Sequence, residues 1–164
     1  MKKLLPILII AVIIIIVIAS ISKQNPMITT QEGNTKKLPI EIIPNHFHDI
    51  ECAMTIESEI NSAQAISPSG KTWFFDDVGC LMKWLEDKSF KDEAILWVYA
   101  KDSKTWIDAK KAWYVLTDKT PMKYGFGARE KRGKNSIDFE QMQLKMLRGE
   151  NLTDPRVRKK LLGI

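Results

Sequence analysis

The chain has 164 residues, of which 45% are hydrophobic and 27% charged, and its formal net charge is +5 at pH 7. This length favours one globular domain over several. The basic runs at 129–134 and 156–160 are typical of solvated loops and helix faces, so the positive charge does not by itself indicate a nucleic-acid site.

The N-terminal stretch is strongly apolar. Leu4 to Ile21 contain no charged residue, and Lys2, Lys3 and Lys23 bracket them. As a helix this run would span about 27 Å, close to the hydrocarbon thickness of a bilayer. We therefore expect a transmembrane anchor over residues 1–22, with a cleaved signal peptide as the alternative. The two lysines at the short end favour a single-pass protein with its C-terminal domain on the periplasmic, extracytoplasmic side, where no nucleic-acid partner is expected.

The next segment has the composition of a linker. Residues 23–45 are polar and contain Pro26, Gly33, Pro39 and Pro44, which indicates a tether. We assign the remaining residues, 46–164, to one compact domain.

The first half of this domain is predicted to contain two paired strands, a helix and a third strand. The strands at 62–67 and 71–77 flank the turn signal PSG and are expected to pair in antiparallel fashion. Residues 78–88 have apolar side chains at helical spacing, with Asp76 or Asp77 as the N-cap. The apolar run at 94–100 is predicted to be a central strand.

The second half is similar in its order of elements. Strands are predicted at 105–109 and 112–117, a glycine-containing loop at 120–128, and a helix at 136–149 that Ser136 or Asp138 would cap. A short helix is expected at 154–164. The predicted fold class is therefore α+β, with two similar halves that share one core.

Two sulfur-bearing residues stand just after the linker. On a strand, Cys52 and Met54 would point to the same face, so their sulfur atoms would lie side by side. A thiolate with a thioether is a soft ligand set that selects Cu(I) over harder divalent ions. Buried cysteine and methionine are also common core residues, so the pair alone leaves a packing role open.

The second thiol belongs to Cys80. It is predicted at the third residue of the helix, where free N–H groups and the helix dipole lower the pKa of a thiol. Three roles remain open: a buried structural thiol, a reactive thiol, and a disulfide to Cys52, which an oxidising compartment would favour. The disulfide would consume the thiol that a metal requires.

Few other residues suggest chemistry. His46 and His48 would share one face if extended and could add an imidazole ligand, although a solvated linker edge explains them better. Met122 lies in a loop, where helix packing does not account for it. The chain has no nucleophile elbow, phosphate loop or haem-attachment motif, so we expect it not to be an enzyme.

Four stretches, in order from Cys52 to Ala128, together resemble the motifs of one family. CAMTI, followed by AQAI, resembles C-G-M-x-I, and GKTWFFDDVGC resembles G-K-x-x-x-F-D-D-x-G-C. WIDAKKAWYV resembles W-I-D-A-x-x-A-x-Y-V, and TPMKYGFGA resembles T-P-M-G-x-G-x-x-A. The family is NosL, whose members are exported copper-binding proteins associated with the assembly of nitrous oxide reductase in denitrification.

The resemblance carries expectations about fold and function. It implies two related ββαβ-type halves, likened to the organomercurial lyase fold, in one compact domain after the N-terminal transmembrane helix. It implies a membrane-tethered metallochaperone that binds Cu(I) and delivers it to an apo copper enzyme, nitrous oxide reductase, through a membrane maturation complex. Cys52 and Met54 occupy the C-x-M metal positions, and Met122 in the P-M loop is the third expected ligand.

The chain departs from the family pattern at several positions. Asp49 stands where many members have an earlier cysteine, and Ala53 and Lys123 replace glycines of the two metal motifs. A helix would replace the lipid anchor of most members.

Two other functions are compatible with the same residues. One is a thiol-dependent enzyme of organomercurial-lyase-like fold, which would use Cys52, Cys80 and Asp77. The other is an interaction module without a metal, braced by a Cys52–Cys80 disulfide.

Overall fold

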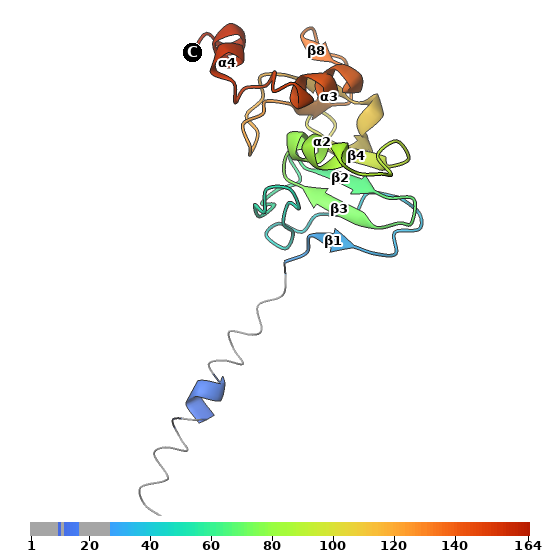
Figure 1. Ribbon diagram of the computed structural model, residues 1–164, viewed down its shortest axis with the longest axis vertical. Coiled ribbons are helices and arrows are strands. Elements are labelled where there is room, and N and C mark those ends of the chain that lie inside the picture. Colours follow the sequence, from blue (N-terminus) through green and yellow to red (C-terminus); the bar gives the residue numbers. More distant parts are fainter. Residues whose placement is uncertain (1–9, 11, 17–26) are drawn as a thin grey trace, which may run out of the picture.

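The computed structural model describes residue 10, residues 12–16 and residues 27–164, which form a mixed α and β fold (Figure 1). The larger sheet has the strand order β1-β3-β2-β4-β5 and the smaller one β7-β6-β8, and every strand pair is antiparallel. The elements are β1 (Thr30–Gln31), β2 (Ala63–Ile66), β3 (Thr72–Phe75), α2 (Val78–Glu86), β4 (Ile95–Ala100), β5 (Thr105–Asp108), the 3-10 helix η1 (Ala109–Lys111), β6 (Trp113–Val115), β7 (Gly127–Arg129), β8 (Ser136–Ile137), α3 (Phe139–Leu147) and α4 (Pro155–Leu162).

Strand β3 divides its side chains between the two faces of the larger sheet. Trp73 and Phe75 point to the main core, which includes the buried face of α2, whereas Phe74 belongs to a smaller core on the opposite side. This alternation is the period of two expected for a strand that is covered on both faces. The predicted antiparallel pairing of the two strands around the PSG turn is confirmed.

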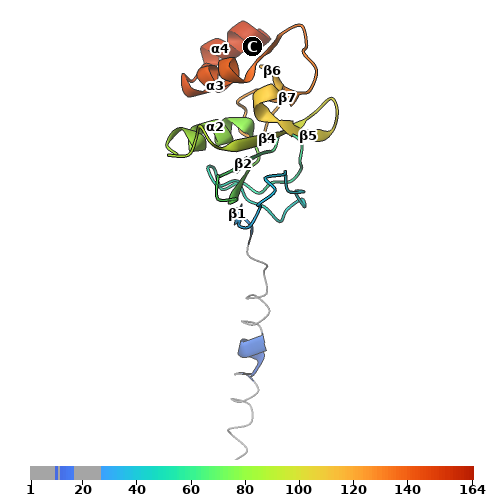
Figure 2. The ribbon, with the colours of Figure 1, turned by 90° about the vertical axis from the view of Figure 1, so that its right-hand side faces the viewer.

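Helix α2 begins where the sequence predicts it. The Asp77 carboxylate caps it by accepting a hydrogen bond from the Gly79 N–H at 2.9 Å. Gly79 has no side chain at the point where the helix meets Tyr124, because a Cβ there would lie 2.3 Å from the Tyr124 ring. The helix therefore packs closely against the 120–128 loop and lies over β2 and β3 (Figures 1 and 2).

The opposite face of the larger sheet is covered by the segment that precedes β2. The Gln64 side chain accepts a hydrogen bond from the Ile40 N–H and donates one to the Ile40 carbonyl. The rings of Phe47 and Phe74 lie 4.5 Å apart, and Ile42 is buried beside them. Together with the pairing of β1 and β3, these contacts show that part of the predicted linker, residues 23–45, lies against the domain; residues 23–26 lie outside the described residues.

The predicted repetition of a ββαβ unit is wrong for the second half. β2, β3, α2 and β4 follow that order in the first half, but β5 joins the larger sheet beside β4. β6 pairs instead with β7, which begins within the predicted loop, and with β8. Local hydrophobic patterns predict where strands occur, whereas long-range pairing decides the sheet to which each belongs.

The prediction of a transmembrane helix over residues 1–22 is contradicted. Within the part of the chain that the structure describes, no helix has the length and apolar character needed to cross a membrane. Ile10 and residues 12–16 are helical, and the other residues of the predicted span lie outside the described residues. The single-pass periplasmic location depended on that helix and is contradicted with it.

Candidate metal centre

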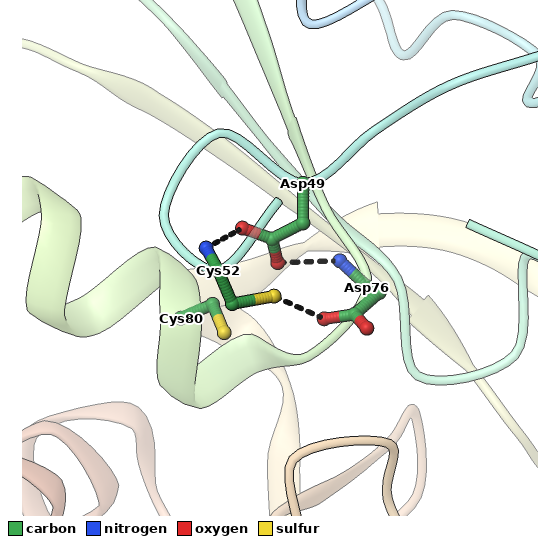
Figure 3. A group of neighbouring side chains, drawn as sticks. All are labelled: Asp49, Cys52, Asp76 and Cys80. Atoms are coloured by element: carbon green, nitrogen blue, oxygen red, sulfur yellow. Dashed lines mark hydrogen bonds between the residues drawn. The ribbon is translucent and has the colours of Figure 1, made fainter. Parts of the chain in front are cut away.

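Four side chains converge between the larger sheet and α2 (Figure 3). They are Asp49 and Cys52 from the turn before β2, Asp76 from the end of β3, and Cys80 from α2. One ligand atom from each, two carboxylate oxygens and two Sγ atoms, lies within 4.8 Å of every other. We call these residues the four-residue group; Cys52 is partly exposed and the other three are buried.

Asp49 holds the turn and the end of β3 together. One of its carboxylate oxygens accepts hydrogen bonds from the N–H groups of Glu51 at 2.7 Å and Cys52 at 3.1 Å. The other accepts from the Asp76 N–H at 2.9 Å. Both oxygens are thus engaged by backbone donors that position the Cys52 and Asp76 side chains, so Asp49 organises the group.

Replacing Asp49 by alanine should lower the free energy of unfolding by about 2 kcal/mol, because it leaves N–H groups in and near the core without acceptors. Urea denaturation of the wild type and of Asp49→Ala measures this difference. Asp138→Ala is the matched control, since Asp138 caps α3 with a single exposed hydrogen bond to the Gln141 N–H and should cost about 1 kcal/mol. Equal losses in both variants would contradict the organising role.

Asp76 is a buried carboxyl group beside a thiol. Its Oδ1 atom accepts a weak hydrogen bond from the Cys52 Sγ atom at 3.8 Å, and its Oδ2 atom is buried without a hydrogen-bond partner. Burial, followed by the interaction with Asp49, raises the pKa of Asp76 to about 8. The carboxyl group is therefore mainly protonated at pH 7 and can donate a proton.

Both thiols are neutral at pH 7 without a metal. Burial raises the pKa of Cys52 to about 11 and raises the pKa of Cys80 even further, with neighbouring carboxylates adding to the shift. The expectation that the helix terminus lowers the pKa of Cys80 is wrong. Asp77 caps the helix and Cys80 is its third residue as predicted, but the side chain is completely buried, and removal from water outweighs the helix dipole.

The raised pKa of Asp76 predicts a pH-dependent stability difference. An acid whose pKa is higher in the folded state than in the unfolded state destabilises the fold as pH rises through the interval between the two values, here from about 4 to about 8. Asn cannot ionise, so the metal-free Asp76→Asn variant should gain stability relative to the wild type across this interval. Denaturation of both proteins at several pH values measures the difference, and a constant difference would contradict the assignment.

The expected ligands Cys52 and Met54 do not lie on a strand. They belong to a turn in which Ala53 has a φ of +61°, so the prediction that an extended strand aligns their sulfur atoms is wrong. Cys52 belongs to the four-residue group, whereas the Met54 side chain is 42% exposed. Met54 as a metal ligand stays a prediction.

Met122 also stays a prediction as a ligand. Its side chain is partly buried and packs against the main core, and its N–H donates a hydrogen bond to the Asp77 carboxylate at 3.1 Å. The histidines lie outside the four-residue group. His46 contacts the Pro44 carbonyl, and His48 contacts the Thr55 hydroxyl, each at 3.0 Å.

The turn positions where the NosL pattern has glycine both adopt a left-handed backbone. Ala53 and Lys123 each have a φ of +61°, a region that glycine enters at less cost than any other residue. The structure thus gives these two positions the conformation that glycine favours, although neither is glycine in this chain.

Sequence reasoning missed two members of the four-residue group as candidate ligands. From the sequence, Asp49 is the replacement for a family cysteine, and Asp76 is one half of an acid pair with Asp77 or an alternative helix cap. One signal in the sequence could have found Asp49, which stands where many NosL members have a cysteine. A residue at a ligand position can direct its side chain into the site even when its type has changed. Cys80 was considered for a disulfide, but both cysteines are free thiols in the structure.

Comparison of the chain with protein-family models, with curated proteins and with solved structures finds no match. The resemblance to NosL therefore stays a prediction. The observed geometry supports a narrower statement, which is that two aspartates and two cysteines form a possible metal-binding group.

Proposed function

We propose that the protein binds one Cu(I) ion through Cys52 and Cys80 and passes it to an acceptor copper protein. The observation that carries this proposal is the convergence of two thiols with two carboxyl groups within 4.8 Å. Thiolates are soft ligands, and soft ligands favour Cu(I).

The carboxyl groups argue against zinc. Structural zinc sites are closed by four ligands, so a zinc ion would require both aspartates in addition to both thiolates. The oxygens of Asp49 already accept three backbone hydrogen bonds, so a four-ligand zinc site would have to share or break them. The two thiolates are the soft ligands of the group, and carboxylates are hard ligands that suit Cu(I) poorly.

Charge is compatible with the same assignment. Binding of Cu(I) by two thiolates leaves a net charge of −1 on the copper and its two sulfur ligands. The protonated Asp76 can donate a hydrogen bond to the Cys52 thiolate and so disperse the remaining charge. The ion thus replaces the protons of the two thiols while Asp76 keeps its own.

The exposure of the thiols suits transfer. Cys80 is completely buried, whereas Cys52 is partly exposed and Met54 beside it is 42% exposed. An incoming or departing ion would therefore meet Cys52 first. We propose an apo copper enzyme as the acceptor, and the NosL resemblance names nitrous oxide reductase; the left-handed conformation at Ala53 and Lys123 supports that resemblance. In this role the protein is a metallochaperone and not an enzyme.

The experiment that tests the proposal is an anaerobic titration of the reduced full chain with Cu(I) in competition with a colorimetric chelator. Retention of one equivalent of copper supports the proposal. Retention of Zn(II) but not Cu(I) under the same conditions would refute it.

A second candidate function is a thiol-dependent enzyme. It is favoured by the protonated Asp76 carboxyl group 3.8 Å from the Cys52 thiol, with a second thiol nearby. In the organomercurial-lyase type of reaction, the two thiols would bind mercury and release their protons to water. The Hg–C bond would break as Asp76 gives its proton to the departing carbon, and water would then reprotonate Asp76. Turnover of an organomercurial that Asp76→Asn abolishes would establish this function. The cavities of about 820, 620 and 370 Å³ are lined by none of the four residues.

A further inference from the structure

A cavity of about 620 Å³ lies between the loop at 117–123, Asn61 and helix α4. Its apolar lining consists of Pro121, Leu152 and Leu162. No α4 residue is buried, and Leu162 is 39% exposed, so the helix leaves apolar surface uncovered at the cavity. A volume of this size is within the range of small-molecule sites.

The charges around the cavity are mainly positive. Lys119, Lys123 and Arg158 line it, and none of them forms an ion pair within residues 27–164. The single carboxylate in the lining, that of Asp118, is already neutralised by Lys101 and Arg129, each at 2.9 Å. Three cations are therefore available to an anionic ligand.

The loop that lines the cavity is held in place by hydrogen bonds. The Thr120 carbonyl accepts from the Lys123 N–H at 3.0 Å, and the Asp77 carboxylate accepts from the Met122 N–H at 3.1 Å. The Thr120 hydroxyl accepts from the Gly125 N–H at 3.3 Å. These bonds hold the loop that lines the cavity in one conformation, which lowers the cost of binding.

We propose that this cavity binds a small organic anion with an apolar body. Lys119, Lys123 and Arg158 would recognise the anionic group, and Pro121, Leu152 and Leu162 would contact the apolar body. The site is separate from the four-residue group and does not depend on copper binding.

Anilinonaphthalene sulfonate is a suitable probe, because it combines a sulfonate with aromatic rings. Its fluorescence should report saturable binding to the full chain. Lys119→Gln and Arg158→Gln should each weaken that binding about tenfold, since each removes a charge-assisted contact. Lys160→Gln is the matched control, because Lys160 lies on the same helix but does not line the cavity.

A second probe isolates the role of the anion. Phenylnaphthylamine has the same rings and N–H group but no sulfonate, so it should bind at least about tenfold more weakly than the sulfonate. The apolar N-terminal stretch can also take up either probe. The measured quantity is therefore the saturable part of the binding, which Lys119→Gln and Arg158→Gln should weaken. Equal affinities of the two probes, equal effects of Lys160→Gln and Arg158→Gln, or no such component would each overturn the proposal.

Discussion

Cys52→Ser and Cys80→Ser should each weaken Cu(I) binding by at least about 100-fold, because each variant removes one of only two strong soft ligands. Chelator competition with the reduced full chain measures both affinities. The two variants should have similar effects, since the Sγ atoms of both residues belong to the same four-residue group.

The controls separate ligand loss from loss of fold. Cys80 is fully buried, so Cys80→Ala is compared with Cys80→Ser, and thermal unfolding without metal establishes that each variant is folded. Met54→Leu keeps both thiols and should weaken binding less than either cysteine variant does. A folded Cys80→Ser protein that binds Cu(I) like the wild type would contradict the two-thiol site.

Gly125→Ala should lower the free energy of unfolding by about 3 kcal/mol. Two effects add up here, the strain of an L residue in a left-handed backbone and the close contacts of the added Cβ. Gly125 has a φ of +91°, where an L side chain is strained. Its added Cβ would lie 2.6 Å from the Leu152 Cγ atom and 2.7 Å from the Leu116 carbonyl oxygen. The carbonyl belongs to the backbone and cannot rotate away, so the contact cannot be relieved by a side-chain change.

Gly149→Ala is the matched control for this prediction. Gly149 also has a positive φ, +74°, but no atom lies within 4 Å of the position of its Cβ. Its substitution should therefore show the backbone strain alone, about 1 kcal/mol. Denaturant titrations of the two variants give the difference, and equal losses would show that the contacts of Gly125 contribute nothing.

The elements of the first half were predictable because their signals are local. The PSG turn predicts the pairing of β2 with β3, and Asp77 followed by an apolar helical pattern predicts the start of α2. The sheet to which β5 and β6 belong was not predictable in the same way. It depends on pairings with β4 and β7, and no local pattern specifies those partners.

The candidate site was predictable only in part for a similar reason. Cys52 was expected as a ligand, but the turn around Ala53 is not a strand, so the side-chain directions inferred for Cys52 and Met54 did not apply. Asp49 belongs to the group because its carboxylate accepts a hydrogen bond from the Asp76 N–H at the end of β3. The two residues lie 27 positions apart in the sequence. Such contacts follow from the tertiary fold and not from spacing.

Burial also changed the chemistry expected from spacing. A thiol in the first turn of a helix usually has a lowered pKa, but for Cys80 the loss of hydration and the nearby carboxylates act in the opposite direction. A thiol in this state is a poor nucleophile without a metal. The same environment suits a soft cation, because the positive charge of the ion offsets the thiolate charge that burial disfavours.

The central claim is that both thiols bind one copper ion, and X-ray absorption at the copper edge tests it most directly. The full chain would be loaded anaerobically with one equivalent of Cu(I), alongside Cys80→Ser loaded in the same way. We predict at least two sulfur neighbours of copper in the wild type and one fewer in the variant. A copper environment made only of nitrogen and oxygen, or one that Cys80→Ser leaves unchanged, would contradict the account.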